Sequence, residues 1–435
     1  MGTAAPNQRA DAAPGFRVWL AGIAAIGFVL RLGFRLAAGP AVFWATGYGF
    51  FWTLARSLAS GHGYAFPGQP PTLFRVPGYP LFLALVSGGH ADFLRIAMAQ
   101  AALSTATAVL TGLYARRLFG SAAGLIAAGL AALYPYYIAH DTSLTELTLL
   151  GALTLAGLLA FDGALARRSV ALAALAGVLL GAGVLTRQTL LPFAVVLAPW
   201  PAITLSRAER WRGIAMGLAL LAATAAVCAP WLMRAHRLSG QWAFDSEGGA
   251  ALYAGNHPRT FAFYPERSID LSRAAIFASP SPEEARARAQ LGPGSPALDR
   301  WYARRGLEAI ASHPLRTLVY ALRKNAAAFG PLPSPRHRLV DNLVHAFSYT
   351  PLLVLGIYGA WRERRRWRRL GSIWLLFACF IVTTGLIWAH SSHRSPLDVY
   401  LMVLASPVLA TAARHARLRA SAGECKGRRD DVVQA

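Results

Sequence analysis

Acidic residues and cysteines are both scarce in this sequence. Its 435 residues include 20 aspartates and glutamates against 43 lysines and arginines, and only three cysteines. So few cysteines exclude a disulfide framework. Charged residues of all kinds make up only 14% of the chain, whereas hydrophobic residues make up 55%. This balance excludes an ordinary soluble domain and is typical of a polytopic membrane protein.

The net charge of +23 is not accompanied by a nucleic-acid-binding pattern. The arginines gather instead in short turns between apolar segments, at residues 116–117, 167–168, 207–212 and 361–369. Cytoplasmic loops are enriched in Lys and Arg, and a basic surface also attracts anionic lipid. We therefore predict a multi-pass protein of the cell inner (plasma) membrane, with these turns and both termini in the cytoplasm and no nucleic acid as partner.

Ten apolar segments suit membrane-spanning helices. They cover residues 18–38, 93–114, 122–137, 144–161, 170–185, 190–205, 214–231, 343–361, 373–388 and 400–412. The predicted fold class is an all-α polytopic bundle of about ten transmembrane helices. No internal repeat is evident, which argues against a secondary transporter built from repeated halves.

The spans divide the chain into five regions. We expect a cytoplasmic tail at 1–17, a transmembrane region at 18–232 with a first extracytoplasmic loop at 39–92, an extracytoplasmic segment at 233–342, a second transmembrane region at 343–414 and a basic cytoplasmic tail at 415–435. Residues 78–89 are mostly apolar but too short to cross a bilayer core of roughly 30 Å, and residues 50–58 and 313–329 also have the pattern of surface helices. They are predicted to be helices that lie at the membrane surface.

Several short motifs occur in the loops that lie opposite the arginine-rich turns. The first loop holds L-A-x-x-L at 54–58, x-G-x-G-Y at 60–64 and R-x-P-G-Y-P at 75–80. Later loops hold P-W-x-x-R at 230–234, G-G-x-x-L-x-x-G-N-x-P at 248–258 and H-R-S-P at 393–396. This set resembles glycosyltransferase family 39 of the GT-C superfamily, which includes protein mannosyltransferases and the bacterial aminoarabinose transferase.

The resemblance covers about residues 18 to 415 and implies an integral membrane glycosyltransferase of the cell envelope. Such an enzyme moves a sugar from a polyprenyl-phosphate donor to an extracytoplasmic acceptor, which can be a lipid, a glycan or a protein. The family holds a catalytic acid just before L-A-x-x-L, but Thr46, Gly47 and Tyr48 occupy those positions here, and no acid occurs between Asp11 and Asp92. A catalytically inactive GT-C-fold protein that binds or presents a lipid-linked sugar is therefore the alternative.

Arginines on the expected outer side are candidates for binding the donor phosphate, because a guanidinium forms paired hydrogen bonds to phosphate and stays charged. Arg75 lies in R-x-P-G-Y-P, whereas Arg187 and Arg394 lie in outer turns, and H-R-S-P resembles the family's R-Y-R-x-P. Anchoring at the interface is the alternative role for all three. Arg31 and Arg35, four apart in the first span, either snorkel to headgroups or help to bind a lipid phosphate.

Glu146 is the first candidate for a catalytic carboxylate. The family has a T-E pair at the matching place, and this chain has Thr145-Glu146. A carboxylate that simply favours a helix N-terminus is the alternative. Asp141 is a second candidate for the catalytic role. We expect Tyr48 and Tyr79 to line the first loop, and Asn256 and His257 to line the extracytoplasmic cap.

Three histidines fall on the expected outer side, namely His140, His390 and His393. Together with Asp141 or Glu146, they offer nitrogen and oxygen ligands for a divalent metal. Their spacing matches no recognised pattern of metal ligands. The sequence therefore firmly implies no metal and no other cofactor, and the expected partners are a polyprenyl-phosphate-linked sugar, membrane lipid and an acceptor.

Overall fold

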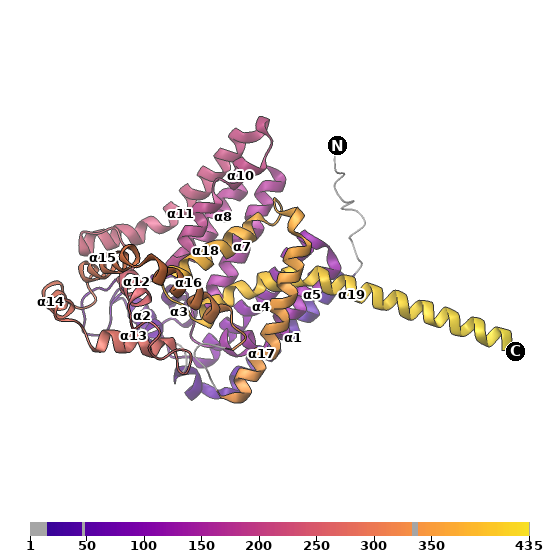
Figure 1. The fold of residues 1–435 in the computed structure, drawn as a ribbon, viewed down its shortest axis with the longest axis horizontal. Coiled ribbons are helices and arrows are strands. Elements are labelled where there is room, and N and C mark those ends of the chain that lie inside the picture. The colour runs from indigo at the N-terminus through magenta and orange to yellow at the C-terminus, as the bar shows by residue number, and fades with distance from the viewer. Residues whose placement is uncertain (1–14, 46–47, 333–337, 435) are drawn as a thin grey trace.

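The computed structural model describes residues 15–45, 48–332 and 338–434. Within these ranges the chain forms α-helices joined by short 3-10 helices and turns, and no β-strand. The predicted all-α membrane class is confirmed. Figure 1 shows long helices packed side by side, with shorter helices gathered at one end and α19 extending away at the other.

Six of the described helices are long and apolar enough to cross a membrane. They are α1 (Phe16–Ala45), α4 (Phe93–Phe119), α7 (Leu147–Arg167), α11 (Arg210–Ser239), α17 (Leu339–Arg362) and α19 (Ser391–Gln434). The other four expected spans correspond to shorter apolar helices: α5 (Ser121–Leu133), α8 (Val170–Thr186), α18 (Gly371–Leu386) and the broken segment formed by η1 (Gln188–Leu190), α9 (Leu191–Leu197) and α10 (Trp200–Thr204).

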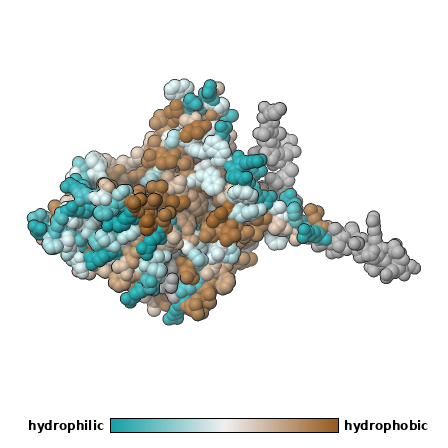
Figure 2. Space-filling model, in the orientation of Figure 1, coloured by the Kyte–Doolittle hydropathy of each residue, from teal (hydrophilic) through white to brown (hydrophobic). Residues whose placement is uncertain are grey.

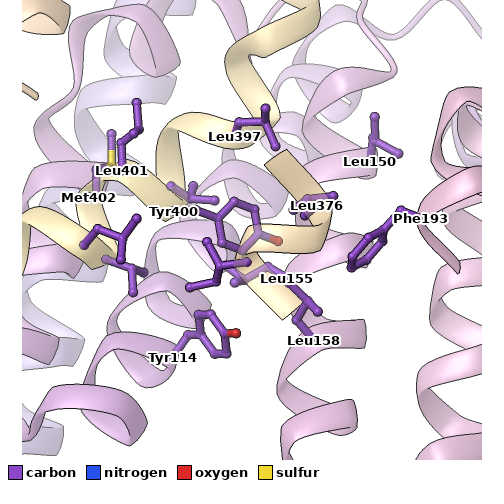
Figure 3. Packing of buried hydrophobic residues seen from close by; sticks show 14 of the residues in the cluster. Tyr114, Leu150, Leu155, Leu158, Phe193, Leu376, Leu397, Tyr400, Leu401 and Met402 are labelled. Atoms are coloured by element: carbon purple, nitrogen blue, oxygen red, sulfur yellow. The ribbon is translucent and has the colours of Figure 1, made fainter. Parts of the chain in front are cut away.

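The bundle packs closely because small residues lie where helices meet. On α8, a Cβ added to Gly177 would lie 2.3 Å from the carbonyl oxygen of Leu220 on α11, so only glycine fits there. Small residues at such positions let membrane helices approach one another. Deeper in the bundle, Figure 3 shows Tyr114, Leu155, Leu376 and Tyr400 gathered from four helices into one apolar core.

Two arginines of α1 are used inside the bundle. Arg31 is fully buried and donates to two carbonyl oxygens at the end of α5, those of Ala131 and Ala132, both at 2.8 Å. Arg35 donates to the carbonyl oxygen of Ala139, also at 2.8 Å. The last carbonyls of a helix have no partner within it, so these guanidiniums satisfy them. Both expected roles, snorkelling and binding of a lipid phosphate, are wrong, since each side chain ties α1 to its neighbours.

Shorter helices form a cap over one end of the bundle. They are α2 (Gly49–Ala59), α3 (Gly78–Ser87), α6 (Pro135–His140), α12 (Gly248–Asn256), α13 (Ile269–Ala278), α14 (Pro282–Leu291), α15 (Pro296–Ser312) and α16 (Pro314–Phe329). Serines cap α13, α14 and α15 by accepting a backbone N–H, as serine commonly does at helix starts. The helices expected at the membrane surface are α2, α3 and α16.

The arginine-rich turns lie together at the other end of the bundle. Arg117 donates to the carbonyl oxygen of Asp162 at 2.7 Å, and Arg369 donates to that of Arg117. Arg168 forms an ion pair with Glu209. The predicted alternation of turns between two ends is thus present in the fold. The side of the membrane that each end faces, and the five regional boundaries, stay predictions.

Candidate active site

A cavity of about 410 Å³ lies where the cap meets the bundle. It receives side chains from the first loop, the start of α7, the turn between α8 and η1, the segment that leads into α12, the start of α13, and the adjoining ends of α18 and α19. The charged, tyrosine, tryptophan and histidine side chains on its wall are Tyr48, Arg75, Glu146, Arg187, Asp245, Glu247, Asp270, Arg273, Trp388, His390 and His393. A volume in this range suits a small organic ligand.

Arg75 faces this cavity from a strained turn. Its φ is 63°, in the left-handed region that residues other than glycine seldom adopt. The guanidinium lies over the rings of Phe50 and Phe74, at 5.8 and 5.3 Å from their centroids. Among the residues that the structure describes, no carboxylate lies within 4 Å of it. Strain of this kind costs about 1–3 kcal/mol and is found where function requires one geometry.

Arg187 has a carboxylate partner. It follows α8 in an extended conformation, and its Nη1 forms an ion pair with Glu146. Glu146 immediately precedes α7, yet its side chain does not cap that helix. Its other oxygen, Oε2, is buried and has no hydrogen-bond partner within the described residues. The pair thus leaves one acceptor of Glu146 unused.

Two further carboxylates are held by the cap itself. Asp245 is buried, and its Oδ1 accepts the backbone N–H of Glu247 at 3.1 Å and of Gly248 at 3.2 Å. Burial raises the pKa of the Asp245 carboxyl, against the lowering effect of these hydrogen bonds and of Arg75. Glu247 forms an ion pair with Arg273 at 2.9 Å. Asp245 therefore fixes the turn that presents Glu247 to the cavity.

The fourth carboxylate, Asp270, is held by neutral or weakly basic groups. Trp388 Nε1 donates to its Oδ1 at 3.0 Å, and His390 Nε2 lies 3.4 Å from its Oδ2. Burial acts to raise the pKa of Asp270, but the interactions with His390 and Trp388 outweigh burial, so the pKa lies below its ordinary value. Asp270 is therefore ionised at neutral pH.

Six of the residues singled out in the sequence line the cavity: Tyr48, Arg75, Glu146, Arg187, His390 and His393. The structure thus brings together two of the three arginines and the first candidate carboxylate. Thr46 and Gly47, the positions of the missing family acid, lie outside the described residues.

The other residues singled out in the sequence do not line the cavity. Asp141 is buried and accepts a hydrogen bond from Ser104 at 2.9 Å. Arg394 is fully buried, and its Nε lies 3.2 Å from Asp398. Tyr79 accepts a hydrogen bond from Gln100 at 2.9 Å in the core.

In the cap, Asn256 donates to the carbonyl oxygen of Leu386 at 2.8 Å. His257 accepts the backbone N–H of Arg259 at 3.1 Å. Both thus take part in hydrogen bonds that hold the cap together, away from the cavity wall.

No sequence pattern had indicated four residues of the wall from the segment 233–342, namely Asp245, Glu247, Asp270 and Arg273. Their only sequence signal is that Asp245 and Glu247 stand directly before the G-G-x-x-L motif. Among the described residues, no three His, Cys, Asp or Glu side chains are placed to hold a metal ion.

Comparisons with known proteins agree with this architecture. Residues 77–233 match the model of the dolichyl-phosphate-mannose-protein mannosyltransferase family. No curated protein matches the sequence significantly. Among solved structures, the apo oligosaccharyltransferase of Archaeoglobus fulgidus superposes with a TM-score of 0.55 at 14% identity, over 94% of this chain and 52% of that one.

Two further structures are similar to the chain. The oligosaccharyltransferase AglB of Archaeoglobus fulgidus, in complex with an inhibitory peptide and a dolichol-phosphate, gives a TM-score of 0.52 at 13% identity, over 94% of this chain and 52% of that one. ArnT of Cupriavidus metallidurans, bound to undecaprenyl phosphate, gives a TM-score of 0.40 at 14% identity, over 94% of this chain and 80% of that one. The chain spans about half the length of the oligosaccharyltransferases. In its fold and over residues 77–233, the chain is therefore similar to membrane glycosyltransferases of the GT-C superfamily.

Proposed function

We propose that this protein transfers a sugar from a polyprenyl-phosphate donor to an extracytoplasmic acceptor. The observation that carries the proposal is Arg75, an arginine without a carboxylate partner among the described residues, held in a strained turn on the wall of a cavity. A buried or half-buried cation of this kind is costly unless an anion joins it. The phosphate of the donor is such an anion, and a guanidinium fits it with paired hydrogen bonds.

The lining of the cavity also suits a lipid phosphate. Besides the arginines, its wall has an apolar part, formed by Leu150, Leu190, Phe193, Leu376 and Phe380 of α7, η1, α9 and α18. Leu150, Phe193 and Leu376 lie around one side of the core in Figure 3. We infer that the phosphate binds at Arg75 and Arg187 and that the polyprenyl tail leaves along this apolar wall. The dolichol-phosphate of the AglB complex supports this choice of ligand.

Glu146 then acts through Arg187. Because its carboxylate pairs with that guanidinium, it orients Arg187 toward the cavity. A carboxylate so engaged is a poor proton acceptor, since protonation would break the pair. We therefore assign Glu146 to positioning and do not carry Asp141 or Arg394 into the site, since neither lines the cavity.

Binding of dolichyl phosphate to the purified protein tests the role of Arg75. Arg75→Ala is expected to weaken binding roughly ten- to a hundredfold, because a hydrogen bond to a charged group contributes about 1.5–3 kcal/mol. Arg75→Lys should restore only part, since an ammonium cannot make the forked contact. Arg56→Ala, an exposed arginine of the same loop that does not line the cavity, is the control.

Arg75→Gly separates lost binding from lost folding. Glycine adopts a φ of 63° without strain, so this variant should melt no lower than the wild type and still bind dolichyl phosphate poorly. Wild-type affinity in Arg75→Ala would contradict the proposal. Release of polyprenyl phosphate from labelled dolichyl-phosphate mannose or undecaprenyl-phosphate hexoses then decides between an enzyme and the inactive alternative, which would bind the donor without releasing it.

A further inference from the structure

The four carboxylates of the cavity wall are not equivalent. Glu146 and Glu247 are held in ion pairs by arginines, and Asp245 is buried and engaged by the backbone of its own turn. Asp270 differs from the two glutamates because no Arg or Lys nitrogen among the described residues lies within 4 Å of it. It differs from the buried Asp245 because its side chain is 50% exposed. It is therefore the carboxylate of this wall that is free to meet a ligand.

The surroundings of Asp270 orient it without using up its acceptor capacity. It lies in the first turn of α13, where the helix dipole favours a negative charge. Trp388 Nε1 engages only Oδ1. Oδ2 has two long contacts, to His390 Nε2 at 3.4 Å and to Ser268 Oγ at 3.5 Å, so it can still accept a shorter hydrogen bond.

The tautomer of the neutral His390 ring follows from its contact with the backbone of Ser392. The backbone N–H of Ser392 donates to Nδ1 at 3.2 Å. A backbone N–H can only donate, so Nδ1 accepts, and the neutral ring carries its proton on Nε2. That proton faces Asp270 and steadies the negative carboxylate.

The geometry points to Asp270 as the catalytic carboxylate, which takes the proton from a hydroxyl group of the acceptor. This inference rests on the proposed function and narrows the acceptor to a hydroxyl-bearing molecule. The first loop has no acid between Asp11 and Asp92, so the carboxylate of this reaction comes from the cap. Asp270 and Arg75 line the same cavity, as a base and a phosphate-binding group must.

The proposed step balances as follows. The acceptor oxygen forms a bond to the anomeric carbon of the donor sugar while the bond from that carbon to the phosphate oxygen breaks. The electron pair of the broken bond leaves with polyprenyl phosphate, whose charge Arg75 offsets. The acceptor proton passes to Asp270 Oδ2 and is released to water when the products leave. General base catalysis of this kind contributes about 10²–10⁴-fold in rate.

Asp270→Asn tests the inference, since it keeps the shape and removes the base. With labelled dolichyl-phosphate mannose or undecaprenyl-phosphate hexoses supplied to native membrane vesicles that retain the acceptor, we expect turnover to fall at least about a hundredfold. Binding of dolichyl phosphate to purified Asp270→Asn should stay within about twofold of the wild type, because Arg75 is intact. Asp270→Glu, which keeps a displaced carboxylate, should recover part of the turnover.

Glu266→Gln is the matched control. Glu266 lies four residues away, is exposed and does not line the cavity, so the same loss of charge there should leave turnover unchanged. Turnover of Asp270→Asn within threefold of the wild type would overturn the inference and leave the proposed function standing. Loss of dolichyl phosphate binding in Asp270→Asn would overturn it too, since the carboxylate would then support the fold. A wild type that binds dolichyl phosphate and never releases it from these donors would refute the proposed function itself.

Discussion

Lys324 is a fully buried lysine whose only hydrogen-bond partners among the described residues are carbonyls. Its Nζ donates to the carbonyl oxygen of Gly255 at 3.0 Å and to that of Ile387 at 3.4 Å, and so ties α16 to α12 and to the end of α18. Burial lowers the pKa of Lys324 to about 7. The amine thus stabilises the cap as a neutral donor above that pH.

The stability of the protein should therefore rise between pH 7 and pH 9. In this range the unfolded lysine binds a proton, since its pKa is then near 10.5, whereas the folded one has lost it. Because the unfolded state binds more protons, the free energy of unfolding increases with pH, by an amount on the order of 2 kcal/mol over two pH units. Melting temperatures measured in detergent at pH 7, 8 and 9 check the expected rise.

Lys324→Met should abolish that rise, because methionine fills the space without titrating. Arg316→Met on the same helix serves as the control and should keep the wild-type pH dependence. An unchanged rise in Lys324→Met would show that other groups cause it.

At the scale of elements, the R-x-P-G-Y-P turn brings α3 against the turn that presents Arg187. A Cβ added to Gly78, at the start of α3, would lie 2.6 Å from the carbonyl oxygen of Leu185 and 2.8 Å from the backbone nitrogen of Thr186. Both contacts involve backbone, which cannot move aside as a side chain can. The glycine of this motif is thus required by a close approach of two elements.

Gly78→Ala should therefore disturb the site from outside the cavity. Overpacking of this kind typically costs about 1–3 kcal/mol, and the displaced turn should also weaken binding of dolichyl phosphate through Arg187. Melting temperature and binding are measured together. Gly129→Ala on α5, where no atom lies within 4 Å of the added Cβ, is the control and should not lower stability. Equal affinity of Gly78→Ala and the wild type for dolichyl phosphate would show that the glycine of the motif does not affect the site.

The sequence predicted elements better than contacts. All ten expected spans correspond to helices, because a run of apolar residues has few other ways to satisfy its backbone in a membrane. The roles of Arg31 and Arg35 were beyond its reach, since their partners lie about a hundred residues away in sequence.

Part of the site could be predicted because some of its residues stand in local sequence motifs. Arg75, Arg187 and Glu146 stand in or beside recognisable motifs and do line the cavity. Asp270 stands in no motif, and its neighbour Trp388 is 118 positions away. Only the folded cap brings it to the wall, so a local pattern carries no trace of its position.

At the scale of the whole molecule, the two ends of the bundle carry opposite chemistry. The cap supplies three of the four carboxylates of the cavity, whereas the turns at the other end are rich in arginine. Figure 2 shows hydrophilic surface over the cap helices and apolar surface over much of the bundle. It also shows an apolar patch over α16, where Leu315, Leu318, Val319 and Leu322 are exposed. This distribution suits a protein that crosses the membrane with α16 resting on its surface.

The orientation follows from the arginines and can be measured directly. Because turns rich in Lys and Arg are retained in the cytoplasm, the run 361–369 should be cytoplasmic and the cap extracytoplasmic. A fluorescent reporter that folds only in the cytoplasm should be active when fused after Arg369 and dark when inserted at Gly294, in the exposed link between α14 and α15. A phosphatase that is active only outside the cytoplasm should give the reverse pattern at the same two sites, which controls for expression. Activity of the first reporter at Gly294, or of the second after Arg369, would place the cavity on the cytoplasmic side, where the donor and acceptor proposed for it would have to be sought.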